Sequence, residues 1–295
     1  MIESMRKVEI EIQSFCNRKC EFCPNKDFNR DMHEEMSEET FIKLFDNLKE
    51  QNFGQMFDGG VVSFTRYSEA MSKPELFKKR VAQAKKRLPF AQFTANTNGD
   101  FLSKENLDGL ELDHLAIMDY DCLGYEECTK KLEDIGINII DIIPDQQTIM
   151  GVHDNGMIVA YSVNWTKNAT LEDRGGYFKQ GEEITHVLDN GEEIKMVWRR
   201  DRRLRSYPCN EPLTFIAIDY AGYVTPCCHI REDNPEHKKY VLGNINESSI
   251  VEIMNSDKTK DFAKRASSIG SISQEEVPEP CKYCQKAGCQ IQYID

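Results

Sequence analysis

The feature that most constrains the fold is an alternation of strand and helix patterns through the first half of the chain. Apolar runs predict strands at residues 8–12, 61–65, 92–96, 114–118 and 137–143, with a sixth candidate at 157–163. Amphipathic stretches between them predict helices that begin near Ser37, Pro74, Ser103 and Tyr125. Such repeats form parallel sheets that curl into barrels. We therefore predict an α/β fold built on a partial (β/α)6 TIM-like barrel.

The pattern changes after about residue 164, which predicts a different organisation for the rest of the chain. Residues 183–198 are typical of a β-hairpin with Asn190-Gly191 as a two-residue turn, and residues 215–224 are typical of a second hairpin. One helix is predicted within 249–266. We divide the chain into a barrel (1–165), a linker with an inserted hairpin (166–205) and a small α+β domain (206–295).

Polar segments follow four of the predicted strands. A loop with cysteines follows the first strand, and the next three strands are followed by residues 66–69, 96–100 and 119–121. Parallel strands place such loops at one edge of the sheet, where these folds bind ligands. We therefore expect the four segments to meet at one site.

The loop after the first strand contains Cys16, Cys20 and Cys23, spaced Cys-x3-Cys-x2-Cys. Three thiolates on one loop can hold three irons of a four-iron four-sulfur cluster, which leaves the fourth iron open for chemistry. The alternatives are a zinc site or a chance group of buried thiols. Zinc usually takes four ligands, and no His or fourth Cys lies close to this loop in the sequence.

This loop resembles that of the radical S-adenosylmethionine (radical SAM) enzymes. The resemblance implies that the open iron binds the amine and carboxylate of S-adenosylmethionine. One-electron reduction would then give a 5′-deoxyadenosyl radical, which takes a hydrogen atom from the substrate. The resemblance also implies a reductant of the flavodoxin or ferredoxin type as a partner.

Composition limits the partners and the compartment. The net charge of −13 argues against nucleic acid or an anionic membrane as the main partner. Residues 1–7 are polar, and no apolar run approaches the length of a bilayer span. Eleven cysteines without an export signal indicate metal ligands or reactive thiols rather than disulfides. We therefore expect a cytoplasmic protein.

A second group of cysteines occupies the last third of the chain, at Cys209, Cys227, Cys228, Cys281, Cys284 and Cys289. Cys281-x2-Cys284 is a chelating pair on one turn, and Cys227 follows the second predicted hairpin. Four of these thiols predict a second metal site. On spacing alone, a structural zinc site of four thiolates is the alternative to an iron–sulfur cluster.

The same segment resembles the SPASM/Twitch extension of radical SAM enzymes. The resemblance implies a small α+β Twitch domain with one auxiliary 4Fe-4S cluster, held by Cys209, Cys227, Cys281 and Cys284. Cys289 follows Cys284 after only four residues, which departs from the longer SPASM pattern. Whether Cys289 replaces Cys209 as the fourth ligand is left open.

Within this family, the resemblance is strongest to the dehydrogenases of aminoglycoside biosynthesis. It is carried by residues 8–11, 16–18, 23–25, 98–102 and 174–176 and by the spacing from Cys209 to Cys227. The hairpin and the basic run after it, and the segment 68–71, depart from the pattern of these enzymes. Those departures leave the substrate open.

The resemblance further implies contacts to S-adenosylmethionine. Glu69 resembles the acidic residue that takes its amino group, and Phe22 lies where the family places an aromatic side chain near adenine. Asn96, Asn98 and Asp119 lie at strand ends, where they could hold ribose hydroxyls. The alternatives are a helix-entry carboxylate for Glu69, local packing for Phe22 and an ordinary Asn-Gly turn at Asn98.

Arginines form two further candidate sites. Arg174 precedes two glycines, which lets the backbone approach a ligand closely, so we expect it to contact substrate or S-adenosylmethionine. Five arginines lie between residues 199 and 205. They could bind a phosphate or an acidic peptide, but such a run is more often a solvated face, which is our interpretation.

The leading functional hypothesis is a redox reaction at a carbon that bears a hydroxyl or an amine. Loss of a hydrogen atom, a proton and one electron would give a ketone, with the auxiliary cluster as electron acceptor and Asp119, Asp121 or His229 as base. The substrate would be a small polar molecule such as an aminocyclitol, a sugar, a nucleoside or a peptide.

Three alternatives stay open. In a radical epimerase, the thiol of Cys228 or Cys289 would return a hydrogen atom to the opposite face of the substrate. Modification of a ribosomal peptide is a second alternative, which is weakened because we see no room before Val8 for a leader-binding domain. A structural iron–sulfur or zinc protein is the third.

Overall fold

The structure is a computed structural model of the 295-residue chain, and it describes residues 4–27, 33–55, 59–168, 177, 183–197 and 204–284. The side chains of Met196 and Val197 are outside the description. Within these ranges, no helix combines the length and the apolar character that crossing a membrane requires.

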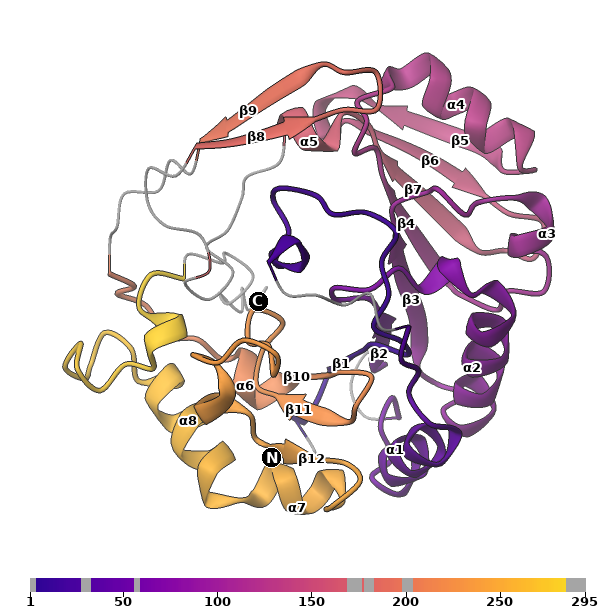
Figure 1. The fold of residues 1–295 in the computed structure, drawn as a ribbon. Coiled ribbons are helices and arrows are strands. Elements are labelled where there is room, and N and C mark those ends of the chain that lie inside the picture. Colours follow the sequence, from indigo (N-terminus) through magenta and orange to yellow (C-terminus); the bar gives the residue numbers. More distant parts are fainter. Residues whose placement is uncertain are drawn as a thin grey trace, which may run out of the picture.

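The centre of the molecule is a ten-stranded sheet with the order β12-β11-β10-β1-β2-β3-β4-β7-β6-β5. Its six middle strands are parallel: β10 (Phe215–Ile218), β1 (Lys7–Ile10), β2 (Val61–Phe64), β3 (Gln92–Thr97), β4 (His114–Met118) and β7 (Ile158–Ser162). Figure 1 shows the sheet as an arc, with the loop that follows β1 on its inner side. The predicted partial barrel is confirmed.

Helices cover the outer side of this arc (Figure 1). They are α1 (Glu38–Glu50), α2 (Pro74–Arg87), α3 (Lys104–Leu107) and α4 (Gly124–Asp134), with the short α5 (Trp165–Asn168) after β7. Ser37 begins α1 as predicted, because its side chain accepts a hydrogen bond from the backbone N–H of Thr40. The apolar stripe of α1 is fully buried against the sheet, at Phe41, Leu44, Phe45 and Leu48.

The fifth predicted strand departs from the parallel pattern. It forms β5 (Asn138–Ile143), which pairs antiparallel with β6 (Thr148–Val152), a strand that we did not predict. Only the turn of Pro144–Gln146 and Gln147, whose φ is +50°, separate the two strands. A parallel crossover needs a dozen residues or more, so this short connection can only reverse the chain. β7, the sixth candidate, therefore takes the parallel position beside β4.

Two other predicted elements differ in detail. The helix expected within 249–266 is two helices, α7 (Ile250–Asn255) and α8 (Asp257–Ser267), because Ser256 ends the first and caps the second. The predicted hairpin forms as β8 (Glu183–Val187) and β9 (Glu193–Val197). Its turn is longer than expected: the N–H of Gly191 donates to the carbonyl of Leu188, so Gly191 closes the turn at φ +83° and does not lie at its centre.

The C-terminal segment continues the same sheet. β10 pairs with β1, and β11 (Tyr223–Thr225) and β12 (Gly243–Asn244) extend the sheet antiparallel beyond it. α6 (Glu211–Thr214) leads into β10, and α7 and α8 pack beside these strands in Figure 1. The sheet is thus continuous across residue 206, and the division of the chain at 165 and 205 stays a prediction.

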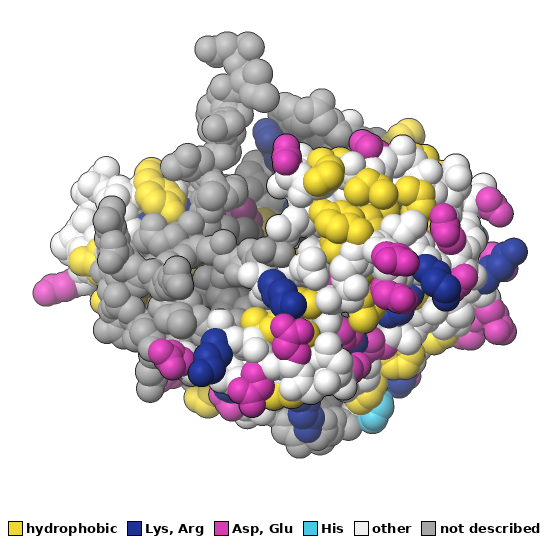
Figure 2. All heavy atoms as spheres, turned by 90° about the horizontal axis from the view of Figure 1, so that it is seen from above, with side chains coloured by type: hydrophobic (Ala, Val, Ile, Leu, Met, Phe, Trp, Pro, Cys, Tyr) yellow, Lys and Arg dark blue, Asp and Glu magenta, His cyan; other side chains and the backbone are white. Residues whose placement is uncertain are grey.

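The described surface is mixed in charge. Figure 2 shows Asp and Glu side chains interspersed with Lys and Arg side chains on the face seen from above. Hydrophobic side chains gather on one part of the same face. Such mixing is typical of a solvated surface.

Packing between the sheet and α2 leads to a prediction about the stability of the protein. Phe64 of β2 is 1% exposed and packs its ring 5.4 Å from that of Phe77 on α2. We expect Phe64→Ala to lower the free energy of unfolding by about 3–5 kcal/mol, because it leaves a cavity between the sheet and α2. Phe90→Ala is the control, since Phe90 is 64% exposed and its loss should cost within about 0.5 kcal/mol. Urea unfolding followed by circular dichroism measures both, and equal losses would contradict the packing described.

Candidate functional site

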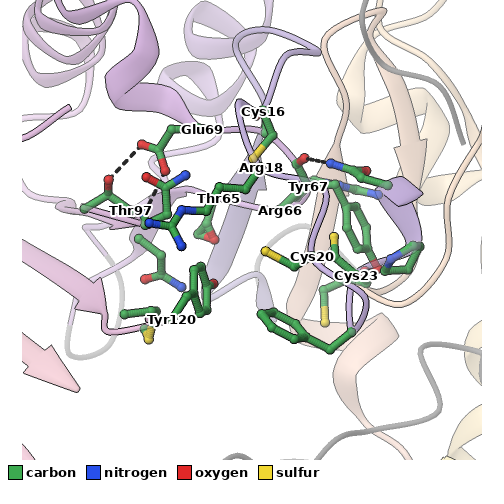
Figure 3. A pocket seen from close by; sticks show the side chains of 18 of the residues that line it. Cys16, Arg18, Cys20, Cys23, Thr65, Arg66, Tyr67, Glu69, Thr97 and Tyr120 are labelled. Carbon is green, nitrogen blue, oxygen red and sulfur yellow. Dashed lines mark hydrogen bonds between the residues drawn. The ribbon is translucent and has the colours of Figure 1, made fainter. Parts of the chain in front are cut away.

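A cavity of about 360 Å³ lies at the carboxyl ends of the parallel strands. Its walls come from the loop after β1 and from the segments that follow β2, β3 and β4 (Figure 3). The prediction that these segments meet at one site is confirmed at this level. Of the residues predicted for the first cluster and for S-adenosylmethionine, the lining includes Cys16, Cys20, Cys23, Phe22, Glu69, Asn96 and Asn98.

The three cysteines of the loop lie together on one side of this cavity (Figure 3). The loop is folded back tightly, because the backbone N–H of Cys23 donates to the carbonyl of Cys20 over 2.9 Å. Burial raises the pKa of the Cys16 thiol to about 12 and the pKa of Cys20 further still. Binding of a metal by these thiols would release their protons. The donor set fits an iron–sulfur cluster.

Arg18 anchors this loop to the rest of the rim. Its guanidinium donates to Asp100 (Nε to Oδ2, 2.6 Å) and to Asp121 (Nη1 to Oδ1, 2.8 Å; Nη2 to Oδ2, 2.6 Å). These carboxylates belong to the loops after β3 and β4, so one side chain joins three of the segments that form the site. Asp121, a candidate base, is therefore committed to an ion pair with Arg18.

Glu69 has the predicted helix-entry role and also faces the cavity. Its carboxylate accepts from the N–H of Met71 (3.0 Å), from the hydroxyl of Thr97 (2.8 Å) and from the N–H of Asn98 (2.8 Å). It caps the turn Ala70–Ser72 and also lines the cavity, although it is only 3% exposed. Burial raises its pKa to about 7. The three donors fix its carboxylate at the cavity wall.

Phe22 lies in an aromatic group at the cavity wall. Its ring centroid is 5.2 Å from that of Tyr120 and 5.1 Å from that of Trp165, and both of these residues also line the cavity. The local packing role is therefore observed. A flat apolar wall of this kind also suits a nucleobase.

The two asparagines at the end of β3 differ in their surroundings. Asn98 donates from Nδ2 to Oδ1 of Asn17 over 2.8 Å and accepts at Oδ1 from the N–H of Asp100 over 3.0 Å. The ordinary turn that we weighed for Asn98 thus exists, with Gly99 at φ +82°. Asn96 lines the cavity from the strand itself.

Asp119 is placed differently from our expectation. Its carboxylate accepts backbone N–H groups of Leu123 (3.0 Å), Asn164 (2.9 Å) and Gly124 (3.3 Å), and it does not belong to the lining of the cavity. It is 2% exposed. A carboxylate used in this way holds the loop after β4 in place, so its predicted roles as ribose contact and base are not carried further. Arg174 and Cys289 lie outside the described residues.

The second group of cysteines gathers beside β11 and α8. Cys209, Cys227 and Cys281 pack with Ile230 and with the ring pair Tyr240–Phe262. The pKa of Cys227 is raised well above its usual value by a hydrogen bond with Cys228, by burial, and by the nearby thiols of Cys281 and Cys284. All four predicted ligands are thus brought to one place.

His229 belongs to this second group. Its backbone N–H donates to Sγ of Cys227 over 3.2 Å, and its ring Nδ1 is 3.9 Å from Sγ of Cys284. Among the described side chains, no three His, Cys, Asp or Glu residues close around a point that would hold a single metal ion. The cluster assignment therefore depends on the proximity of the thiols and on the family matches given below.

The two cysteine groups meet at Cys228, which lines the cavity. The Tyr67 hydroxyl donates to the Cys228 carbonyl over 3.0 Å, and the side-chain amide of Asn25 donates to the carbonyl of Tyr67. Arg231 closes the connection, because it donates to Oδ1 of Asn25 over 2.8 Å and its Cζ lies 4.2 Å from the Tyr67 ring centroid. A buried polar bridge thus joins the loop of Cys23 to the loop of Cys227.

Glu9 lines the cavity although no sequence pattern singled it out, whereas Arg66 and Tyr67 belong to the segment 66–69 that we expected at the site. Glu9 lies on β1 and Glu11 directly follows it. Their i, i+2 spacing was the available signal, since it puts both carboxylates on one face of an extended chain. Arg66 has φ +118°, which few residues other than glycine adopt. Its buried guanidinium donates to Oγ1 of Thr225 (3.2 Å) and to the carbonyl of Ile230 (2.9 Å). No sequence pattern announces that arrangement.

Comparison with protein families gives two matches. Residues 10–117 match the model of the radical SAM superfamily, and residues 209–285 match SPASM, an iron–sulfur cluster-binding domain. The first match contains the loop of Cys16, Cys20 and Cys23, and the second contains the auxiliary cysteines up to Cys284. Together the two domains imply two iron–sulfur clusters.

Individual relatives extend over nearly the whole chain. An S-adenosyl-L-methionine-dependent 2-deoxy-scyllo-inosamine dehydrogenase of Niallia circulans is 24% identical over 287 residues, 97% of this chain and 94% of its own. The crystal structure of BtrN in complex with AdoMet and 2-DOIA matches with a TM-score of 0.67 and 23% identity, over 97% of this chain and 95% of BtrN. Native anSMEcpe with bound AdoMet matches with a TM-score of 0.53 and 12% identity, over 96% of this chain and 92% of its own.

Asp219, in the turn between β10 and β11, generates a prediction about pH. Burial raises its pKa to about 7, so the folded protein favours the protonated form. That contribution to stability is fully present below the pKa of the unfolded chain, about 4, and is lost as pH rises through about 7. Asp219→Asn keeps an Oδ1 that can accept the N–H groups of Ala221 and Tyr223. We expect this variant to gain on the order of 2–4 kcal/mol over the wild type between pH 4 and pH 8.

Urea unfolding of the metal-free protein at several pH values measures this difference. Asp145→Asn is the control, because Asp145 is exposed on the turn after β5. The control should follow the wild type at every pH. A difference between wild type and Asp219→Asn that stays constant across the range would contradict the prediction.

Proposed function

We propose, for a chain that carries a radical SAM domain followed by a SPASM iron–sulfur domain, that it oxidises a carbon bearing a hydroxyl or an amine on a small polar substrate. One observation carries this proposal: the same cavity is lined by the three cysteines of the first loop and by Cys228 of the second cysteine group. A dehydrogenase of this type needs an electron acceptor next to the substrate. The second group of cysteines would hold that electron acceptor.

The proximity of the thiols and the two family matches support a ligand set for each cluster. Cys16, Cys20 and Cys23 would hold the first cluster, and Cys209, Cys227, Cys281 and Cys284 would hold the auxiliary cluster. When bound, the first cluster and S-adenosylmethionine supply a radical that takes a hydrogen atom from the substrate, and the auxiliary cluster takes up one electron. The bridge of Asn25, Tyr67 and Arg231 would keep the two loops at a fixed separation.

Glu69 would bind the ammonium group of S-adenosylmethionine. Its carboxylate lies at the cavity wall near the cysteine loop, and an ammonium–carboxylate hydrogen bond is among the stronger contacts available to a protein. Because Met71, Thr97 and Asn98 already fix its orientation, binding would require no rearrangement of the side chain. Phe22 and Asn96 would complete this side of the site.

A cationic, hydroxyl-bearing substrate fits the remaining wall. Glu9 lines the cavity and is 7% exposed, and Arg66 and Tyr67 place further polar groups beside it. A buried carboxylate pairs well with an ammonium group, and hydroxyls can satisfy the other polar atoms. The relative named for 2-deoxy-scyllo-inosamine dehydrogenation acts on such an aminocyclitol. We therefore propose an amino-substituted cyclitol or sugar as the substrate class.

A second reaction is favoured by the position of Cys228. Cys228 lines the cavity, so its thiol could return a hydrogen atom to a substrate radical, as an epimerase requires.

We further propose a cytoplasmic location and a flavodoxin or ferredoxin as reductant. A reducing compartment suits thiol-ligated clusters, and these proteins supply single electrons.

A labelling experiment tests the proposed function. Anaerobically reconstituted protein is incubated with S-adenosylmethionine, a reductant and 2-deoxy-scyllo-inosamine deuterated at its ring carbons. We expect deuterium in 5′-deoxyadenosine and a substrate product lighter by two hydrogens. Cys20→Ala should abolish both, because it removes one of the three ligands. Cleavage without deuterium transfer from any aminocyclitol tested would reject the substrate class.

The same reaction in heavy water separates oxidation from epimerisation. An epimerase that uses Cys228 would place solvent deuterium on carbon, and Cys228→Ala would stop that incorporation. A dehydrogenase would incorporate none at that carbon, and Cys228→Ala would retain the oxidised product.

Glu9→Gln tests the substrate class independently. The change removes the negative charge but keeps the size of the side chain, so KM for an amine-bearing substrate should rise about 10- to 100-fold, the usual worth of a hydrogen bond to a charged group. An analogue with a hydroxyl in place of the amine is the matched control and should lose little. Equal losses for both compounds would show that Glu9 does not bind the ammonium group.

A further inference from the structure

Arg205 is buried, although it belongs to the basic run that we interpreted as a solvated face. It is 1% exposed, and its guanidinium donates to three backbone carbonyls. Nε donates to Tyr207 (2.8 Å), Nη2 to Pro208 (2.9 Å) and Nη1 to Cys284 (3.3 Å). The other arginines of the run lie outside the described residues. The expectation of a solvated face is therefore wrong for Arg205.

These carbonyls belong to two segments that are far apart in the sequence. Tyr207 and Pro208 lead directly into Cys209, whereas Cys284 ends the other ligand pair. The backbone of Arg205 joins the same segments, because its N–H donates to the carbonyl of Lys282 over 2.6 Å. One residue thus fastens the Cys209 segment to the Cys281–Cys284 turn, and it does so from inside the protein.

We propose that Arg205 is a positioning residue of the auxiliary cluster, which holds two of its ligand segments together and places a positive charge beside it. This inference rests on the proposed ligands Cys209, Cys227, Cys281 and Cys284. A cluster gains negative charge when it is reduced, so a buried cation nearby favours the reduced state and raises the reduction potential. Such a shift would favour acceptance of an electron from the substrate.

Another buried arginine of this region, Arg231, has a carboxylate among its partners. Arg231 is 2% exposed and pairs with the carboxylate of Asp233, from Nε over 2.7 Å and also from Nη2. The negative charge of Asp233 therefore offsets the positive charge of Arg231. The backbone carbonyls of Tyr207, Pro208 and Cys284 orient the guanidinium of Arg205.

The experiment uses Arg205→Gln, Arg205→Lys and the control Lys264→Gln. Lys264 lies exposed on α8, so this control removes one positive charge from the same region without touching the ligand segments. Each change is made in the full chain and in a background with Cys16→Ala, Cys20→Ala and Cys23→Ala, where only the auxiliary cluster would remain. Anaerobic redox titration followed by electron paramagnetic resonance gives its potential, and iron per chain gives occupancy.

We expect Arg205→Gln to make reduction of the auxiliary cluster about tenfold less favourable, a shift of about 59 mV to more negative potential. Arg205→Lys should keep most of the parent potential, and Lys264→Gln should match the parent. If Arg205→Gln instead loses the cluster, iron in the full chain should fall from about eight to about four, with the first cluster kept. Either result supports the proposal.

Other outcomes overturn it. Full iron with an unchanged potential in Arg205→Gln would show that the residue neither positions nor tunes the cluster. Loss of both clusters together with a lower melting temperature of the metal-free protein would show a general folding role. Absence of iron in the triple-cysteine background itself would reject the proposed ligands, which is distinguishable from a failure of Arg205 alone.

Discussion

The parallel pairing of β1 with β10 is the contact on which the site depends. It joins Lys7–Ile10 to Phe215–Ile218, so strands separated by about 200 residues lie side by side within the sheet. The loop of the first cysteines follows β1, and the second cysteine group follows the hairpin of β10 and β11. Without this pairing, the two groups of thiols would have no reason to share a cavity.

Side chains then fix what the sheet brings together. Tyr67 is held by contacts with both loops. Its carbonyl accepts a hydrogen bond from Asn25 near the first cysteine loop, and its ring contacts the guanidinium of Arg231 near the second. Arg18 performs a similar task on the opposite side of the loop, where it joins the segments that follow β3 and β4. The cavity is thus bordered by charged and polar contacts, which are more directional than apolar packing.

Local signals in the sequence predicted the elements well where one residue decides the structure. Ser37 and Ser103 begin helices because their side chains accept a backbone N–H, and Gly136 follows α4 at φ +84°. The chain reverses at the polar turn 144–147, which was the available signal for β6 and was not used. The sheet order could not be read at all, since the place of β10 beside β1 is set by contacts between distant segments.

The site, like the fold, could be predicted where the signal is local and could not where it depends on distant segments. Local spacing predicted the group of Cys16, Cys20 and Cys23 and the pair of Cys281 and Cys284. The resemblance to the SPASM/Twitch extension added Cys209 and Cys227. The burial and hydrogen-bond partners of Asp119 and Arg205 were not predictable, since they depend on backbone groups that other segments supply. A carboxylate at a strand end has the same appearance in the sequence whether it faces a ligand or holds a loop.

The ion pairs of Arg18 bear on what happens to the first cysteine loop when the protein is exposed to oxygen. They connect the first cysteine loop to Asp100 and Asp121 through contacts that involve no iron. When oxidation strips the metal from this loop, its anchors remain in place. We therefore expect the loop to stay ordered after loss of its iron, so that refilling it would require reduced cysteine thiols, iron and sulfide.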